Sequence, residues 1–321
     1  NPRRYSLEQA LWKAGRNDLD SLAHRLANYV NSMTSQLADV HINEGFAASN
    51  RDLSSTLVPL GCRHVALGRY VEEQLRQHVT RTRKAALVVF SGIKINKLDD
   101  LEQILARGEV NMVIAAGGLA LALKTAQARQ RGETFGLGLA GDPDHPKIHI
   151  PEERIAQAER MLSDAQAHGV EFVLPVDFVL GDGSASARIP DGEAQFDVGP
   201  ETRALQAEAV GRFIAAHQQE VAEGRPASIA FHNGVFGLFE EEAFESGTRA
   251  FIGQLKRMTD AGVEVYVGGG EGGTALGRYG EPDWVTHCFT AGGTILKALG
   301  NNPIPYIQAL HASTQESQPG S

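Results

Sequence analysis

From residue 84 onward, short apolar runs alternate with segments of helical periodicity, and this alternation most constrains the fold. The runs have the length of strands and are apolar almost throughout, which indicates strands buried on both faces. They lie at Ala86–Phe90, Met112–Ala115, Phe172–Leu174, Ile229–Phe231, Val263–Val267 and Val285–Phe289. The helical patterns lie at 98–106, 119–128, 152–168, 202–217, 241–258 and 294–299. Strands that alternate with helices predict an α/β fold with a parallel sheet covered on both sides.

Glycines follow five of the predicted strands. They stand in Ser91-Gly92, Ala116-Gly117-Gly118, Asn233-Gly234, Gly268-Gly269-Gly270 and Gly292-Gly293. In a parallel sheet the carboxyl ends of the strands meet at one edge, and ligands bind there. A glycine turn that leads into a helix leaves backbone N–H groups free for an anion, and the helix dipole adds positive potential. The sequence therefore predicts a phosphate-binding edge.

Charge and cysteine content restrict the partners and the compartment. The chain has 39 acidic and 30 basic residues and a formal net charge of −9, which argues against a general nucleic-acid surface. Cys62 and Cys288 are far apart, with no second ligand at metal spacing, which favours a reducing compartment. The sequence contains no apolar run of membrane-spanning length and no visible signal peptide. We therefore expect a cytoplasmic protein without a membrane partner.

Several ordered blocks resemble those of the phosphoglycerate kinase family, over Asn1 to about Leu310. The blocks are Ala38–Asn43, Ser91–Lys94, Leu174–Val179, Asp197–Thr202, His232–Glu240 (continuing through Phe244 to Gly247-Thr248), Gly268–Glu271 and Thr290–Gly293. The resemblance implies two Rossmann-like parallel-sheet domains joined by a hinge. In the family, the N-terminal domain binds 3-phosphoglycerate or 1,3-bisphosphoglycerate and the C-terminal domain binds Mg-ADP or Mg-ATP. Closure of the two domains brings these substrates together.

The resemblance also implies a division of the chain. We expect a partial N-terminal, phosphoglycerate-binding domain with a hinge helix at 1–83, a nucleotide-binding domain at 84–299, and a C-terminal segment and tail at 300–321, disordered from Gln315. The family's first strands carry an aspartate, an asparagine and a catalytic arginine that have no counterpart in this sequence. Because the sequence also starts at Asn1 without methionine, we expect an N-terminally truncated or diverged member with an incomplete N-terminal domain.

Phosphoryl transfer depends on positioning and on positive charge that neutralises the moving group. Lys94 matches the family's first phosphate-binding lysine, and Lys97 stands one residue short of the second. A spacing of three still places both lysines on one face of a helix. The catalytic set implied by the resemblance is Lys94, Lys97, Gly270 and Gly293. Arg51, and with it Arg3, matches an arginine that holds the acidic substrate.

The nucleotide-binding set implied by the resemblance is Lys97, Gly117, Gly118, Asn233, Glu240, Gly269, Gly270, Glu271 and Gly272. Gly117 and Gly118 match glycines beside the adenine, where a side chain would block a flat ring. Glu240 matches the glutamate that accepts hydrogen bonds from the ribose hydroxyls; the alternative is an ordinary acid in the first turn of a helix. Glu271 stands where the family has the aspartate linked to Mg²⁺.

The resemblance implies a monomeric glycolytic kinase that transfers phosphoryl reversibly between 1,3-bisphosphoglycerate and ADP, giving 3-phosphoglycerate and ATP, with a carboxyl group as acceptor. A second hypothesis is a weak or inactive paralogue that serves as a nucleotide-binding or interaction module. It is favoured by Glu271, because Mg²⁺ demands strict geometry, and by Gly272, which replaces a hydroxyl residue. A dinucleotide dehydrogenase would need an acid about 20 residues beyond its glycines. Thr290–Gly293 stand there, and we set that reading aside.

Overall fold

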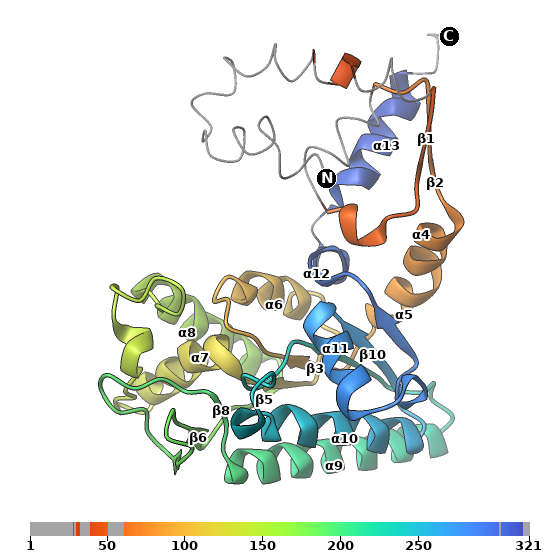
Figure 1. The fold of residues 1–321 in the computed structure, drawn as a ribbon. Coiled ribbons are helices and arrows are strands. Elements are labelled where there is room, and N and C mark those ends of the chain that lie inside the picture. The colour runs from red at the N-terminus through yellow and green to blue at the C-terminus, as the bar shows by residue number, and fades with distance from the viewer. Residues whose placement is uncertain (1–27, 29, 33–38, 51–60, 302, 317–321) are drawn as a thin grey trace. The chain divides into compact units, whose positions relative to one another are not determined.

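The computed structural model of the chain describes residues 28, 30–32, 39–50, 61–301 and 303–316 (Figure 1). The chain divides into two compact units. One unit is Val79–Gly300, and the other combines Asn1–His78 with Asn301–Ser321. Arg3 and Arg51, the two expected substrate-binding arginines, lie outside the described residues.

A six-stranded parallel sheet forms the centre of the unit Val79–Gly300. Its strands are β3 (Leu87–Phe90), β4 (Met112–Ala115), β5 (Glu171–Val173), β9 (Ile229–Asn233), β10 (Glu264–Gly268) and β11 (His287–Phe289). They lie in the order β11-β10-β9-β3-β4-β5. The chain enters at the centre with β3, moves outward to β5, and then returns to β9 on the other side of β3. The sheet confirms the predicted α/β class, and such a reversal is the place where doubly wound sheets bind ligands.

Helices cover both faces of this sheet. They are α6 (Lys97–Leu105), α7 (Gly117–Gln130), α8 (Glu152–Ala167), α9 (Pro200–Ala222), α10 (Ser246–Asp260), α11 (Gly270–Tyr279) and α12 (Gly292–Leu299). Leu87 and Val89 of β3 belong to a core that includes apolar residues of α9 and α10, the two helices drawn along one face in Figure 1. Val88, between them in the strand, and Ile104 of α6 line the same small cavity on the other face. Every residue of β3 is buried, which explains its continuous apolar run.

Two buried aspartates cap helices of this unit. Asp177 accepts hydrogen bonds from the N–H groups of Glu201 (3.0 Å) and Thr202 (2.7 Å) at the start of α9. Asp197 accepts from the N–H of Gly247 at 2.7 Å, at the start of α10. Helix α10 therefore begins at Ser246 and not at residue 241 as expected, and Glu242–Phe244 form a separate 3-10 turn, η6.

The small sheet that carries Asp197 is antiparallel, in the order β7-β6-β8. Its strands are β6 (Phe178–Val179), β7 (Ala185–Ser186) and β8 (Asp197–Val198). The sequence blocks around Asp177 and Asp197 thus have a structural function, because each supplies a helix cap. Between α7 and α8, the structure has one short 3-10 turn, η5 (Gly138–Gly141).

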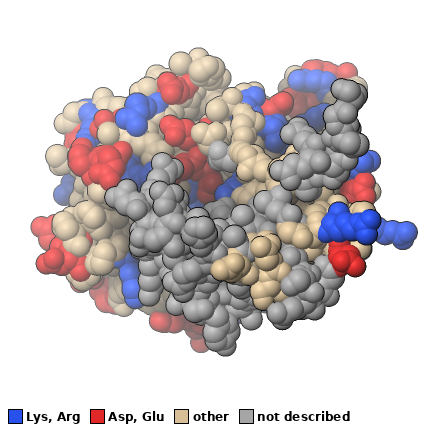
Figure 2. Space-filling model, turned by 90° about the horizontal axis from the view of Figure 1, so that it is seen from above, with Lys and Arg blue, Asp and Glu red and all other residues tan. Residues whose placement is uncertain are grey.

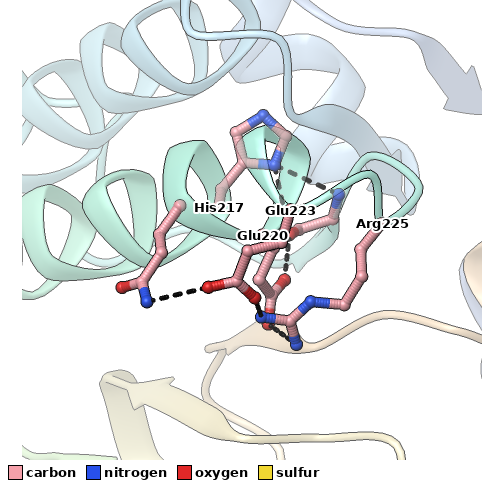
Figure 3. Close-up of polar contacts among 6 residues, drawn as sticks. His217, Glu220, Glu223 and Arg225 are labelled. Atoms are coloured by element: carbon pink, nitrogen blue, oxygen red, sulfur yellow. Dashed lines mark hydrogen bonds and ion pairs between the residues drawn. The ribbon is translucent and has the colours of Figure 1, made fainter.

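A polar cluster joins the end of α9 to the start of β9 (Figure 3). The Nδ1 of His217 accepts from the Ser228 N–H at 3.2 Å, and the Ser228 hydroxyl donates to Glu220 at 3.1 Å. Arg225 pairs with Glu220 at 3.0 Å and with Glu223 at 2.8 Å. The cluster lies at the amino end of β9, away from the glycine turns, so it fixes the helix-to-strand connection.

The other unit contains the parallel pair β1 (Val40–Asn43) and β2 (His64–Leu67), the 3-10 turn η3 (Phe46–Ala48) and α13 (Pro305–Glu316). Tyr306 of α13 is fully buried; its hydroxyl donates to the Ala66 carbonyl at 3.0 Å and its N–H to the Ser49 carbonyl at 3.1 Å. Because α13 extends through Glu316, the prediction of disorder from Gln315 is wrong for Gln315 and Glu316.

Within the stretch 1–83, where a hinge helix is expected, residues 69–82 are helical in three segments. These are α4 (Arg69–Glu73), the π-helical η4 (Gln74–Val79) and α5 (Thr80–Thr82). The last predicted strand is shorter than expected, because Pro282–Trp284 form a 3-10 turn, η7, before β11 begins at His287. Across the described ranges, no helix has both the length and the apolar character to cross a membrane.

Candidate functional site

The ends of β3 and β9 are drawn together at the point where the chain reverses across the sheet. The Ser91 N–H donates to the Asn233 carbonyl at 2.9 Å, and the Ser91 hydroxyl donates to the Val235 carbonyl at 2.6 Å. Gly234 has φ +103°, and a Cβ there would lie 2.2 Å from the Ser91 carbonyl oxygen. Only glycine therefore fits at Gly234 without moving the backbone.

Lys97, the first residue of α6, directs its ammonium group into this junction. Nζ donates to the Ser91 carbonyl at 2.6 Å and to Oδ1 of Asn233 at 3.1 Å, and it lies 5.9 Å from the centre of the Phe90 ring. Burial lowers the Lys97 pKa, while the charge of Glu271 acts in the opposite direction. An ammonium group has three protons, so one remains for a ligand.

Asn233 connects Lys97 to the glycine turn after β10. Its Nδ2 donates to the Gly268 carbonyl at 2.9 Å, while its Oδ1 accepts from Lys97. Both hydrogen-bonding atoms of the buried amide are thereby used, which fixes its orientation. Asn233 therefore places the lysine beside the start of α11.

Two helix N-termini lie side by side at this edge. Gly269 precedes α11 with φ +94°, and a Cβ there would lie 3.7 Å from the Cα of Gly292, the first residue of α12. Neither helix has a side-chain cap, and α11 makes its first backbone bond from Gly273 to Gly269. The N–H groups of residues 270–272 consequently have no partner within the helix and are suited to an anion.

Gly117 and Gly118 are required by the backbone itself. Gly117 has φ +67°, and its Cβ would lie 2.6 Å from the Gly92 carbonyl oxygen. A Cβ on Gly118 would lie 2.7 Å from the Ile93 carbonyl oxygen, and the Gly118 N–H donates to the Gly92 carbonyl at 3.0 Å. These contacts join the ends of β3 and β4, so these glycines have a packing role, and the adenine-binding role remains a prediction.

Glu240 lies in a turn after β9 and is exposed. It is not in the first turn of a helix, so that alternative is wrong. Two side chains of α11 hold the peptide bond between Phe239 and Glu240. Arg278 donates to the Phe239 carbonyl at 2.7 Å, and the Tyr279 hydroxyl lies 3.1 Å from the same carbonyl. Among the described residues, none pairs with the Glu240 carboxylate.

A sequence profile described as "PGK: Phosphoglycerate kinase" matches residues 5–302 of the chain. The chain belongs to the phosphoglycerate kinase family. Phosphoglycerate kinase of Saccharomyces cerevisiae is 29% identical over 313 residues, which cover 93% of this chain and 66% of that protein. Phosphoglycerate kinase of Clostridium novyi is 30% identical over 85% of this chain and 64% of its own length. The chain thus spans slightly less than two thirds of these relatives.

Solved phosphoglycerate kinases have the same fold. The enzyme from Coxiella burnetii superposes with a TM-score of 0.65 at 26% identity, over 90% of this chain and 68% of its own. The enzyme from Pyrococcus horikoshii has a TM-score of 0.68 at 21% identity, over 88% of this chain and 66% of its own, and at that identity it supports the fold alone. The comparisons confirm the resemblance and the fold class.

Lys94 does not lie on a helix with Lys97, contrary to the expectation from the sequence. It is exposed and precedes α6, which begins at Lys97, so the prediction that both lysines share a helical face is wrong. The two are instead joined by a turn, in which the Lys97 N–H donates to the Lys94 carbonyl at 3.2 Å. The positive charge of Lys94 still lowers the pKa of Lys97, although burial is the larger cause.

Figure 2 shows acidic and basic side chains of the described residues interspersed over the face in view. Glu271 is exposed in the first turn of α11, and no group of three acidic, histidine or cysteine side chains with metal-binding geometry occurs in the described ranges. Mg²⁺ is commonly held by one or two carboxylates together with substrate phosphates. Glu271 therefore fits a Mg²⁺ ion that arrives with a nucleotide.

Sequence reasoning missed the structural roles of three residues in this unit. Ser91 acts partly through its backbone carbonyl, which leaves no pattern in the sequence. Glu245 is buried, with 6% of its surface exposed. In the sequence, the only indication of this burial is that the acid stands next to an aromatic residue. Asp197 belongs to one of the sequence blocks, but no role is predicted for it. An acid beside the apolar Val198 in a short strand would have indicated a cap.

Proposed function

We propose that the unit Val79–Gly300 binds ADP or ATP with Mg²⁺ at the carboxyl edge of its sheet, and that the chain serves the phosphoglycerate kinase reaction. In that reaction 1,3-bisphosphoglycerate and ADP give 3-phosphoglycerate and ATP, reversibly. The observation that carries the proposal is the arrangement of Lys97, Asn233 and the start of α11. Hydrogen bonds connect Lys97 through Asn233 to the Gly268 carbonyl, just before α11, and the starts of α11 and α12 lie side by side there.

Each group has a proposed task. The N–H groups at the starts of α11 (Gly270–Gly272) and α12 (Gly292, Gly293) bind phosphate oxygens, and Lys97 and Lys94 neutralise charge on the phosphoryl group. Glu271 reaches a Mg²⁺ ion held by the phosphates, and that ion supplies further positive charge. Glu240 accepts from the ribose hydroxyls, and Gly117 and Gly118 lie against the adenine. Asn233 orients Lys97.

The acidic substrate is assigned on family membership. Arg51 and Arg3 are the proposed ligands of its phosphate and carboxylate groups, since an arginine fork binds either group with two hydrogen bonds. A cytoplasmic, monomeric protein is part of the same proposal.

A second candidate is a nucleotide-binding module without transfer. The observation that favours it is the environment of Lys97, whose ammonium group already makes two hydrogen bonds to the protein and has a pKa lowered by burial. A lysine held in this way orients and binds more readily than it follows a moving phosphoryl group. A coupled assay of ATP formation from 1,3-bisphosphoglycerate and ADP separates the two candidates.

Calorimetric titration with Mg-ADP and Mg-ATP tests nucleotide binding directly. We expect the unaltered chain to bind both, and Lys97→Met and Lys94→Ala to weaken binding by about tenfold each, the loss of one charge-assisted contact. Lys147→Ala is the matched control for Lys94→Ala, since Lys147 is also exposed but lies in the loop before α8. Absence of heat with either nucleotide in the unaltered chain would contradict the proposed function.

A further inference from the structure

Glu245 is a buried acid whose carboxylate is fully occupied by three side chains. Its Oε1 lies 2.9 Å from Arg249, and its Oε2 lies 3.0 Å from Arg278 and 2.8 Å from the Tyr279 hydroxyl. Both guanidinium groups also lie over the Tyr279 ring, at 5.2 and 5.1 Å from its centre. Acids are almost never buried unless paired in this way, so Glu245 has a specific structural task.

Two of these partners also hold the backbone just before Glu240. Arg278 donates one guanidinium N–H to Glu245 and another to the Phe239 carbonyl at 2.7 Å. The Tyr279 hydroxyl lies within hydrogen-bond distance of both Glu245 and the Phe239 carbonyl, which share its single proton. Glu245 therefore fixes the two side chains that fix the peptide bond between Phe239 and Glu240.

Arg278 and Tyr279 are the last residues of α11, the helix whose first turn supplies N–H groups for phosphate. A helix transmits position rigidly along its axis, and ten residues of helix span about 15 Å. The contacts thus set the turn that carries Glu240 at a defined place relative to the start of α11. Among the described residues, Arg278 and Tyr279 are the only side chains that hold the Phe239 carbonyl.

We propose that Glu245 is a positioning residue that presents Glu240 to the ribose of the bound nucleotide, through Arg278, Tyr279 and the Phe239 carbonyl. The inference rests on the proposed function, in which Glu240 reads the ribose hydroxyls. A ligand that lacks those hydroxyls gains nothing from Glu240, so it is insensitive to how Glu240 is placed. A merely structural role of Glu245 would weaken both kinds of ligand alike.

The test compares ADP with 2′,3′-dideoxy-ADP, each with Mg²⁺, by calorimetry on the full chain. In the unaltered protein we expect ADP to bind about tenfold more tightly, because hydroxyl groups that donate to a carboxylate form charge-assisted bonds. In Glu245→Gln we expect ADP to bind about fivefold more weakly while the affinity for dideoxy-ADP stays the same, so the tenfold preference falls to about twofold.

Two further variants complete the experiment. Tyr279→Phe removes one hydroxyl from the same contacts, and we expect it to lower the preference for ADP by a smaller factor; circular dichroism verifies that each variant is folded. Glu242→Gln removes an exposed acid from the adjacent turn and should keep the preference of the unaltered protein. Glu245→Gln with an unchanged preference overturns the inference. Equal binding of both nucleotides by the unaltered protein overturns it too, while nucleotide binding itself stands; binding of neither refutes the proposed function.

Discussion

Asn233 has an ionisable group on each side, the half-buried Lys97 in space and the buried His232 in sequence. Lys97 uses its charge, because two oxygen atoms accept its hydrogen bonds. His232 is 2% exposed and packs against Phe251, with ring centres 5.4 Å apart. Burial lowers the pKa of His232 to about 4. The histidine is therefore a neutral packing residue at neutral pH.

This histidine makes the fold sensitive to acid. Because its pKa falls from 6.5 in the unfolded chain to about 4 in the fold, the unfolded state binds the extra proton between these values, and stability falls as the pH falls. We expect His232→Leu to gain about 2 kcal/mol relative to the unaltered protein between pH 6.5 and pH 5, at about 1.4 kcal/mol per pH unit. Urea unfolding at a series of pH values measures it.

The variant comparison is needed because other groups titrate in the same range. Burial raises the pKa of Asp197 to about 6 and that of Asp100 to about 6, so these acids oppose the effect of His232. They are present in both proteins, and their contributions cancel in the difference. A difference that stays constant from pH 7 to pH 5 would show that His232 does not titrate as described.

At the scale of elements, glycines decide where α11 begins. Gly269 has φ +94° and packs beside Gly292, whereas Gly277 lies within α11 and a Cβ there would meet nothing within 4 Å. Both glycines belong to α11 or its cap, but their backbone conformations and the space around them differ. Only the first needs to be glycine.

Alanine substitution separates these requirements. We expect Gly269→Ala to destabilise the protein by about 1 kcal/mol or more, because alanine is strained at positive φ, and to weaken Mg-ADP binding. Gly277→Ala should stabilise it by about 0.5–1 kcal/mol through helix propensity and leave binding unchanged. Urea unfolding and calorimetry check both variants. If Gly269→Ala binds Mg-ADP as tightly as Gly277→Ala, the α11 turn does not contact the nucleotide.

Elements with a strong apolar pattern could be predicted from the sequence, and elements fixed by remote contacts could not. Met112–Ala115 is a strand with the predicted bounds, because its four buried residues match its pattern. The start of α10 was missed because Asp197, which caps it, is 50 positions away from Gly247 in the sequence. At the site, the glycine turns and Asn233 were found from their place after strands. The contacts of Lys97 with Ser91 and of Glu245 with α11 depend on folded geometry.

At the scale of the whole molecule, the described residues of the proposed nucleotide site lie within one unit. Lys97, Asn233, Glu240, α11 and α12 all belong to Val79–Gly300. A ligand that binds only the folded form at 100 times its dissociation constant adds about 2.7 kcal/mol of stability. We expect saturating Mg-ADP to slow hydrogen exchange in β9 and β10 accordingly and to leave the exchange of α13 unchanged, as measured by mass spectrometry. In Lys97→Met, whose affinity is about tenfold lower, the effect should fall to about 1.4 kcal/mol at the same nucleotide concentration, and equal protection of α13 would contradict the assignment.

The predicted division of the chain at 83 and 299 differs by a few residues from the contact-based units, which divide after His78 and after Gly300. The sequence does not indicate that residues after 300 pack with the unit that contains Asn1–His78. The contacts of Tyr306 with Ser49 and Ala66 are formed across more than 200 residues.

Helix α13 packs with the unit that contains Asn1–His78, and this has a consequence for synthesis on the ribosome. The unit Val79–Gly300 is one continuous stretch, and it is complete as soon as Gly300 has left the exit tunnel. The other unit needs Tyr306, which is translated after the whole of Val79–Gly300, to fill its place beside β2. Domains fold as units during synthesis. The segment that precedes Val79 therefore completes its packing only after the unit Val79–Gly300 has been made.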